Sequence, residues 1–209
     1  MLPGTIAAPV DFEQVIRKSR FLAHLEPVTS IELADAAIVA VRKRYPDARH
    51  HCVALIVGDQ QRSNDGGEPS GTAGVPMLEV LRRRNLTDII AIVTRYFGGV
   101  LLGAGGLVRA YSSSVALALD QARLVQRVQM LPIIVDAPPG RLEHEVRTWA
   151  GAAGAIIESV EYGQSTRISL LADAATMPGL QSLLASAGAP TPLIGDARIV
   201  GVVAGAGRD

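Results

Sequence analysis

The sequence is poor in cysteine, lysine and aromatic residues, and it carries no excess of charge. Its single cysteine, Cys52, cannot form an internal disulfide, and it lies in an apolar run. We therefore expect a buried thiol in a protein of the reducing cytoplasm. The 20 basic residues are balanced by 20 acidic ones, which argues against a strongly basic, non-specific nucleic-acid binder. We expect no DNA specificity.

Long apolar runs are also missing. The run at 89–93 is far too short to cross a bilayer, and the first residues lack the basic and apolar segments of a signal peptide. We therefore expect a soluble, cytoplasmic protein without a membrane partner. Apolar residues still make up 48% of the chain, which is enough for one large or two small packed cores.

The first part of the chain combines strand and helix patterns, with turn residues and caps between them. Strands are predicted over 10–16, 20–27, 51–57 and 88–94. Helices are predicted from Ser30, as N-cap, to Tyr45, from Pro76 to Asn85, and from Gly106 onward. The first two strands are separated by three residues, so we expect them to form a hairpin.

The last third predicts strand, helix, strand, strand, helix and strand in succession. The predicted strands cover 131–136, 155–161, 166–171 and 198–204, and the helices cover 141–150 and 177–187. This βαββαβ order is the split arrangement of a ferredoxin-like domain. A long helix gives way to a strand near Gln129, so we expect domains at 1–129 and 130–209.

Glycine clusters between Ser63 and Tyr111 form the candidate site. A phosphate-binding Walker loop is excluded because no lysine follows Lys43. The dinucleotide fingerprint fails because Val108 occupies the position of its third glycine. Two interpretations stay open for the glycines before the last long helix of this region: an anion site at its N-terminus, or tight packing in a strand-to-helix turn.

The same stretch offers few catalytic groups. Its hydroxyls and acids have no histidine within their own loop, although His50 or His51 could approach in space. Adjacent histidines on a strand point to opposite faces, and no cluster with zinc spacing is present in the sequence, so we expect no metal and no cofactor. The acids are equally well explained as turn formers, and Thr72 as the cap of the following helix.

Three motifs in this stretch resemble the IMPACT family, in its bacterial YigZ-like form. They are Asp-Gly-Gly-Glu-Pro-Ser-Gly-Thr-Ala-Gly at 65–74, Arg-Tyr-Phe-Gly-Gly at 95–99 and Leu-Gly-Ala-Gly-Gly-Leu-Val-Arg-Ala-Tyr-Ser at 102–112. Ser19-Arg20-Phe21 and the segment 48–52 also resemble family positions, so the resemblance covers most of residues 10–120. The chain departs from the family at Gly66, where the second of two adjacent aspartates is usual.

The resemblance implies an α+β protein with two domains. The first would be similar to ribosomal protein S5 domain 2, and the second would be ferredoxin-like and similar to the last domain of elongation factor G. It also implies a non-catalytic, translation-associated regulator that binds RNA, the ribosome or a translation-control protein. The alternative is an enzyme or binding protein for a small molecule or phosphometabolite in the glycine-lined cleft.

The predicted binding surface combines the charged, aromatic and glycine residues of these motifs. In the RNA interpretation, its arginines contact phosphates and an exposed tyrosine stacks on unpaired bases. Its residues are His50, His51, Asp65, Glu68, Ser70, Thr72, Arg95, Tyr96, Gly98, Gly99, Gly105, Gly106, Arg109 and Tyr111.

Overall fold

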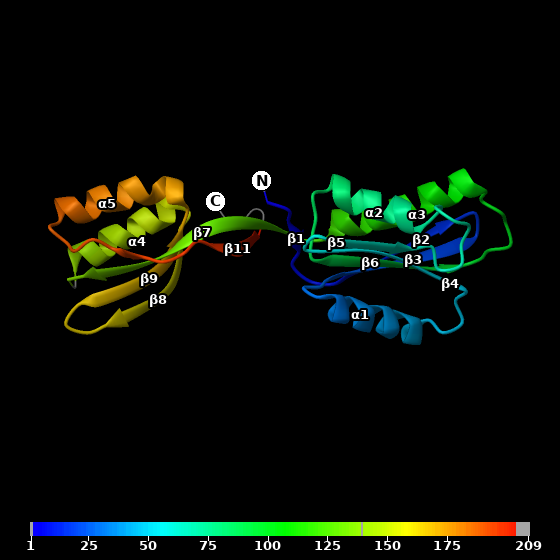
Figure 1. Cartoon of the computed structure of the whole chain (residues 1–209), viewed down its shortest axis with the longest axis horizontal. Coiled ribbons are helices and arrows are strands. Elements are labelled where there is room, and N and C mark those ends of the chain that lie inside the picture. Colours follow the sequence, from blue (N-terminus) through cyan, green and yellow to red (C-terminus); the bar gives the residue numbers. More distant parts are fainter. Residues whose placement is uncertain (1, 139, 204–209) are drawn as a thin grey trace. The chain divides into compact units, whose positions relative to one another are not determined.

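The computed structural model describes residues 2–138 and 140–203. The chain separates into two compact units between Arg127 and Val128, and the end of the last strand, from Gly201, belongs to the first unit. Helices and strands are mixed in both units (Figure 1). The predicted α+β class with two domains is therefore confirmed.

Unit 1 is built on an antiparallel sheet with the strand order β2-β3-β6-β4-β5. Its strands are β2 (Val10–Ile16), β3 (Ser19–Pro27), β6 (Ile89–Tyr96), β4 (His50–Val57) and β5 (Gln60–Asn64). Outside this sheet, β1 (Thr5–Ile6) pairs with the beginning of β7 (Leu124–Ala137). The sequence did not predict β5, because this edge strand is polar and exposed at every position.

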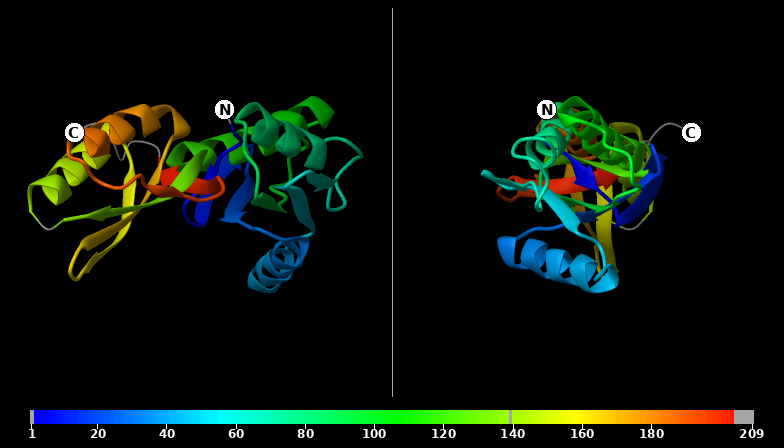
Figure 2. Two further views of the ribbon diagram at one scale, coloured as in Figure 1. Left: turned by 60° about the vertical axis from the view of Figure 1, so that its left-hand side comes forward. Right: turned by 90° about the vertical axis from the view of Figure 1, so that its right-hand side faces the viewer.

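Three helices cover the two faces of this sheet. The helices α2 (Gly74–Arg83) and α3 (Ala104–Gln121) lie on one face, and α1 (Ile31–Arg44) lies on the other (Figures 1 and 2). Residues Cys52, Ala54 and Ile56 of β4 join the core with α2 and α3, and their neighbours Val53, Leu55 and Val57 join the core with α1. A strand buried on both faces must be apolar throughout, as its sequence indicated.

Local signals determine where several of these elements begin. The β2–β3 hairpin turns at Arg17 and Lys18, which both have positive φ, and Ser30 caps α1 by accepting the Leu33 N–H at 3.3 Å. The predicted hairpin and first helix are thus present. The start predicted for α2 was two residues late, because that helix begins at Gly74 and Pro76 lies inside its first turn.

Unit 2 contains the remaining elements, except that the last strand passes into unit 1 at Gly201. These are α4 (Arg141–Ala153), β8 (Ile156–Tyr162), β9 (Thr166–Ala172), the 3-10 turn η1 (Ala174–Thr176), α5 (Met177–Ser186), β10 (Leu193–Ile194) and β11 (Arg198–Val203). In its sheet, β9 lies between β7 and β8, while β10 and β11 pair with β7. Both α4 and α5 contribute buried apolar residues to the core on one face of that sheet. Ala204, the predicted last strand residue, lies outside the described residues.

One strand is much longer than its sequence indicated. The strand β7 begins at Leu124, seven residues before the predicted start, because its first residues pair with β1. Such a pairing partner, more than a hundred residues away, leaves no local trace in the sequence. In residues 2–138 and 140–203, no helix has the length and apolar character needed to span a membrane.

Candidate functional site

A buried acid, arginine and tyrosine form the centre of the glycine-rich region. Glu68, in the loop between β5 and α2, accepts hydrogen bonds at Oε1 from Arg95 Nη1 at 2.7 Å and from Tyr111 Oη at 2.7 Å. The side chains of Glu68 and Arg95 are only 3% and 6% exposed. Three separate segments of unit 1 are thereby tied together: the loop before α2, the end of β6 and the helix α3.

The arginine of this cluster is enclosed by further groups. Its guanidinium lies over the rings of Phe21 at 5.4 Å and Phe97 at 5.6 Å, a cation–π arrangement. Arg95 Nη2 donates to Ser19 Oγ at 3.4 Å, and the same oxygen accepts the Gly98 N–H at 3.1 Å. Arg95 Nε is buried and has no hydrogen-bond partner among the described residues.

Tyr111 is fully buried and is held in its protonated form. Burial raises the pKa of its hydroxyl far above the ordinary value, and the neighbouring Cys52 and Glu68 raise it further. The ring of Tyr111 packs edge-on against Phe21, with centroids 5.2 Å apart. The tyrosine therefore acts as a hydrogen-bond donor to Glu68 and not as an acid or base.

A hollow of about 440 Å³, here called the main hollow, opens above this cluster. Segments from four parts of unit 1 form its wall: the start of β4, the loop before α2, the end of β6 and the beginning of α3. Two apolar side chains in this wall, Phe97 and Leu101, are 52% and 81% exposed. The lining residues are Arg49, His50, Gly67, Glu68, Pro69, Arg95, Phe97, Leu101, Leu102, Gly103, Ala104 and Leu107.

Asp65 does not face a ligand but caps α2. Its Oδ1 accepts the N–H groups of Ala73 at 3.0 Å and Gly74 at 2.8 Å, and its Oδ2 accepts that of Gly71 at 2.8 Å. Partial burial raises the pKa of this carboxyl, but the three N–H donors lower it more, so its pKa lies below the usual 3.8. The prediction that Thr72 caps α2 is wrong: its hydroxyl donates to the Pro69 carbonyl at 2.6 Å.

Replacing Asp65 by alanine is expected to lower the free energy of unfolding by about 1–2 kcal/mol near neutral pH, the usual cost of a lost helix cap. A carboxyl with a lowered folded-state pKa stabilises the protein above its unfolded pKa, and this contribution disappears as the pH falls through the folded value. The difference between wild type and variant, measured by urea unfolding, should therefore be constant above pH 5 and shrink below about pH 4. Asp47→Ala, at an exposed acid, is the control.

The two adjacent histidines point to opposite faces of the sheet, as predicted from strand geometry. His50 lines the main hollow, and its Nδ1 lies 3.2 Å from the Gly66 carbonyl. His51 Nδ1 lies 3.0 Å from Thr94 Oγ1. Burial lowers the pKa of His51, and the positive charge of Arg42 lowers it further. Only His50 can therefore contribute to the main hollow.

The other predicted residues do not form one surface. Tyr96 follows Arg95 in a strand and so faces the opposite side of the sheet, where the Arg20 guanidinium lies 5.6 Å from its ring. Arg109 lines a second hollow of about 270 Å³, here called the neighbouring hollow, which also contains Gly106. Ser70, Gly99 and Gly105 are exposed on loops or at the start of α3. The prediction that Arg95 and Tyr96 belong to one binding surface is therefore corrected, since Arg95 is buried and Tyr96 lies on the other side of the sheet.

Sequence reasoning missed the contribution of Cys52 to this region. Its thiol donates to the Asp65 carbonyl at 2.9 Å, and burial raises the pKa of the thiol to about 12. The continuous apolar run around Cys52 did predict its burial, which the structure confirms. Only the hydrogen bond to a residue thirteen positions away had no sequence signal.

Cys52 in the folded protein is expected to resist alkylation by iodoacetamide at pH 8, because the attacking species is the thiolate and this thiol stays protonated. Labelling followed by mass spectrometry should show a rate at least about a hundredfold below that of the urea-unfolded chain. Rapid labelling of the native protein would show that the loop before α2 opens readily and exposes the thiol.

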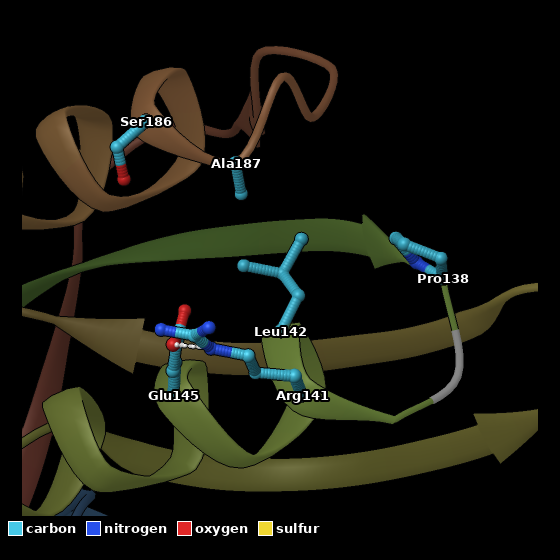
Figure 3. A pocket seen from close by; sticks show the side chains of 6 residues that line it. All are labelled: Pro138, Arg141, Leu142, Glu145, Ser186 and Ala187. Carbon is cyan, nitrogen blue, oxygen red and sulfur yellow. Dashed lines mark hydrogen bonds and ion pairs between the residues drawn. The ribbon is translucent and has the colours of Figure 1, made fainter.

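Unit 2 has a hollow of its own, of about 460 Å³, between α4 and the end of α5. Its two charged lining side chains, Arg141 and Glu145, pair with each other at 2.7 Å (Figure 3). Leu142, Pro138 and Ala187 supply apolar surface. None of the predicted site residues lies there. Among the residues that the structure describes, no group of three histidine, cysteine, aspartate or glutamate side chains could hold a metal ion.

This region of the chain is similar to a known protein family. The model of the Impact N-terminal domain matches residues 17–119, all within unit 1. IMPACT family member YvyE of Bacillus subtilis is 46% identical over 149 residues, which cover 68% of this chain and 69% of that protein. IMPACT family member YigZ of Escherichia coli is 49% identical over 120 residues, 55% of this chain and 59% of that protein. A crystal structure of a hypothetical protein aligns with 93% of this chain and 97% of its own, at 32% identity and a TM-score of 0.59.

Proposed function

Because this chain belongs to the IMPACT family, in its YigZ-like form, we propose that it is a non-catalytic regulator of translation that binds a partner through the main hollow of unit 1. The observation that carries this proposal is the arrangement of charged and apolar side chains in the hollow. Its central ionisable groups are bound to one another, while exposed apolar side chains surround its opening. Such a surface favours binding over chemistry.

The groups at the centre are poorly suited to catalysis. Glu68 accepts hydrogen bonds from both Arg95 and Tyr111, so its Oε1 is engaged. The raised pKa values of Tyr111 and Cys52 keep both groups protonated, which removes them as bases or nucleophiles. What these residues do is hold the three segments that shape the hollow.

In a second candidate function, the main hollow binds a small molecule or phosphometabolite. Its volume falls within the range of ligand sites, and the N-terminus of α3 lines it and can receive an anion. Thermal-shift measurements with nucleotides, phosphorylated metabolites and inorganic phosphate test this alternative. A shift that disappears in Leu101→Ser would support it, and no shift with any compound counts against it.

Two experiments test the first proposal. They are affinity capture with the tagged full chain and co-sedimentation of the protein with ribosomes over a salt series. We expect ribosomes or a translation protein to be retained by the wild type and lost with Leu101→Ser. The matched control is Leu33→Ser, since Leu33 is an exposed leucine on α1, on the other face of the sheet. If the wild type retained neither ribosomes nor any translation protein, the proposal would be rejected.

A further inference from the structure

We infer that the main hollow and the N-terminus of α3 bind an acidic segment of a partner polypeptide, with an apolar side chain inserted into the hollow. The inference rests on the proposed function and specifies the chemistry of its partner. Two separate features of the surface favour this ligand: its exposed apolar residues and its unbalanced positive charge.

The apolar part comes from the loop between β6 and α3. Phe97 and Leu101 are largely exposed, and Val100 between them is 38% exposed. Pro69, Leu102 and Leu107 also line the hollow and extend this apolar surface into it. A contiguous apolar patch of this kind on a polar protein surface marks an interaction site, and the hollow volume of about 440 Å³ can hold one or two apolar side chains of a partner.

The positive charge begins with the helix itself. The eighteen-residue α3 starts after Gly103, which has no side chain to cap it, and its first turn contains no acidic residue. Helix N-termini attract anions through their free N–H groups and the helix dipole. Arg95 also lines the hollow, but its charge is paired with Glu68, so the free positive charge at this end of α3 comes from other side chains.

Exposed basic side chains surround this helix end. Arg49 lines the main hollow, and Arg17 and Arg109 line the neighbouring hollow, which shares Leu102 with it. Lys18 belongs to the hairpin turn whose backbone packs against Gly98. In the described part of the chain these four side chains form no ion pair, although many arginines elsewhere do. Among the described residues that line the two hollows, Glu68 is the only carboxylate, and Arg95 neutralises its charge.

Together these features favour an acidic polypeptide over RNA. RNA could use the arginines and stack a base on Phe97, but the exposed aliphatic side chains of Val100 and Leu101 offer little to a nucleotide. A peptide that alternates carboxylates with leucine, isoleucine or phenylalanine satisfies both the charge and the apolar surface.

A display library of short random peptides, selected on the full chain, tests the inference directly. We expect enriched peptides to carry aspartate or glutamate next to a large apolar residue. For the best peptide, fluorescence anisotropy should show binding that weakens with salt and that falls about tenfold in Leu101→Ser and in the double variant of Arg49→Ala with Arg109→Ala. Leu33→Ser and Arg83→Ala, at exposed positions on α1 and α2 away from both hollows, should leave it unchanged.

Other outcomes would overturn the inference. These are no enrichment, enrichment without acidic residues, and peptides that bind Leu101→Ser as well as the wild type. A randomised single-stranded RNA pool, tested in parallel, would replace the peptide as occupant if it bound and lost affinity only with the arginine variants. The two proposals fail in different ways. Capture of no translation component would reject the proposed role in translation. A translation partner captured equally by wild type and Leu101→Ser would reject binding through the main hollow, and the acidic peptide with it, while leaving a role in translation.

Discussion

Replacing Glu68 by glutamine is expected to lower the free energy of unfolding by about 3–5 kcal/mol, the cost of removing one partner from a buried ion pair. The amide keeps the shape of the side chain and an oxygen for the Tyr111 hydroxyl, but it leaves the charge of Arg95 buried and uncompensated. Urea unfolding followed by far-ultraviolet circular dichroism measures the change.

The chain supplies a matched control for this substitution. Glu13 pairs with Arg20 at the same distance of 2.7 Å, but the two side chains are 43% and 51% exposed. Glu13→Gln should therefore cost less than about 1 kcal/mol. If Glu68→Gln costs no more than this control, the pair is not isolated from water in solution. Adding Arg95→Met to Glu68→Gln should recover part of the loss, because it removes the unpaired charge.

The layers of unit 1 could be predicted because burial leaves a local pattern. The central strands β4 and β6 are apolar on both faces, and α1 has a serine cap and an apolar stripe. The edge strand β5 had no such pattern, since all five of its residues are exposed. Pairing with β4 alone determines its conformation, and that partner cannot be read from the five residues themselves.

The candidate site was predicted as a set of residues and not as an arrangement. Glu68 is 27 positions from Arg95 and 43 from Tyr111, so no spacing rule connects them. Charged residues near glycines suggest an exposed loop, whereas the side chains of Glu68 and Arg95 are buried. The separation of Arg95 from Tyr96 was accessible to sequence reasoning. The predicted strand ended at residue 94, and extending it by two residues would have placed the two side chains on opposite faces.

The departure from the family motif at Gly66 also has a structural reason in this chain. Gly66 adopts a positive φ of 57°, and a Cβ there would lie 2.4 Å from the backbone oxygen of His51. An aspartate could not occupy this backbone without moving β4 or the loop. Asp65 alone still accepts the N–H groups of Ala73 and Gly74 at the start of α2 and that of Gly71 in the loop before it. In this chain, one aspartate therefore makes all three of these hydrogen bonds.

Replacing Gly98 by alanine is expected to destabilise the protein by about 3 kcal/mol or more, at the upper end of the cost of overpacking. A Cβ at this position would lie 2.0 Å from the Lys18 carbonyl carbon and 2.4 Å from the Ser19 nitrogen, and neither backbone atom can rotate away. The hairpin turn or the loop after β6 must therefore move. Because Ser19 Oγ bonds both the Gly98 N–H and Arg95, such a movement also disturbs the buried cluster.

Two other glycines separate this steric effect from a general effect of glycine replacement. Gly99→Ala meets open space but has a positive φ of 83°, so we expect a loss of about 1 kcal/mol. Gly151→Ala, inside α4 and without neighbours, should stabilise by about 0.5–1 kcal/mol. Circular dichroism reports the unfolding of the chain, and fluorescence reports unit 2 alone, since the only tryptophan is Trp149 in α4. Equal costs for Gly98→Ala and Gly99→Ala would show that the close approach of Lys18 yields easily, and that glycine is needed in this loop for its backbone conformation and not for space.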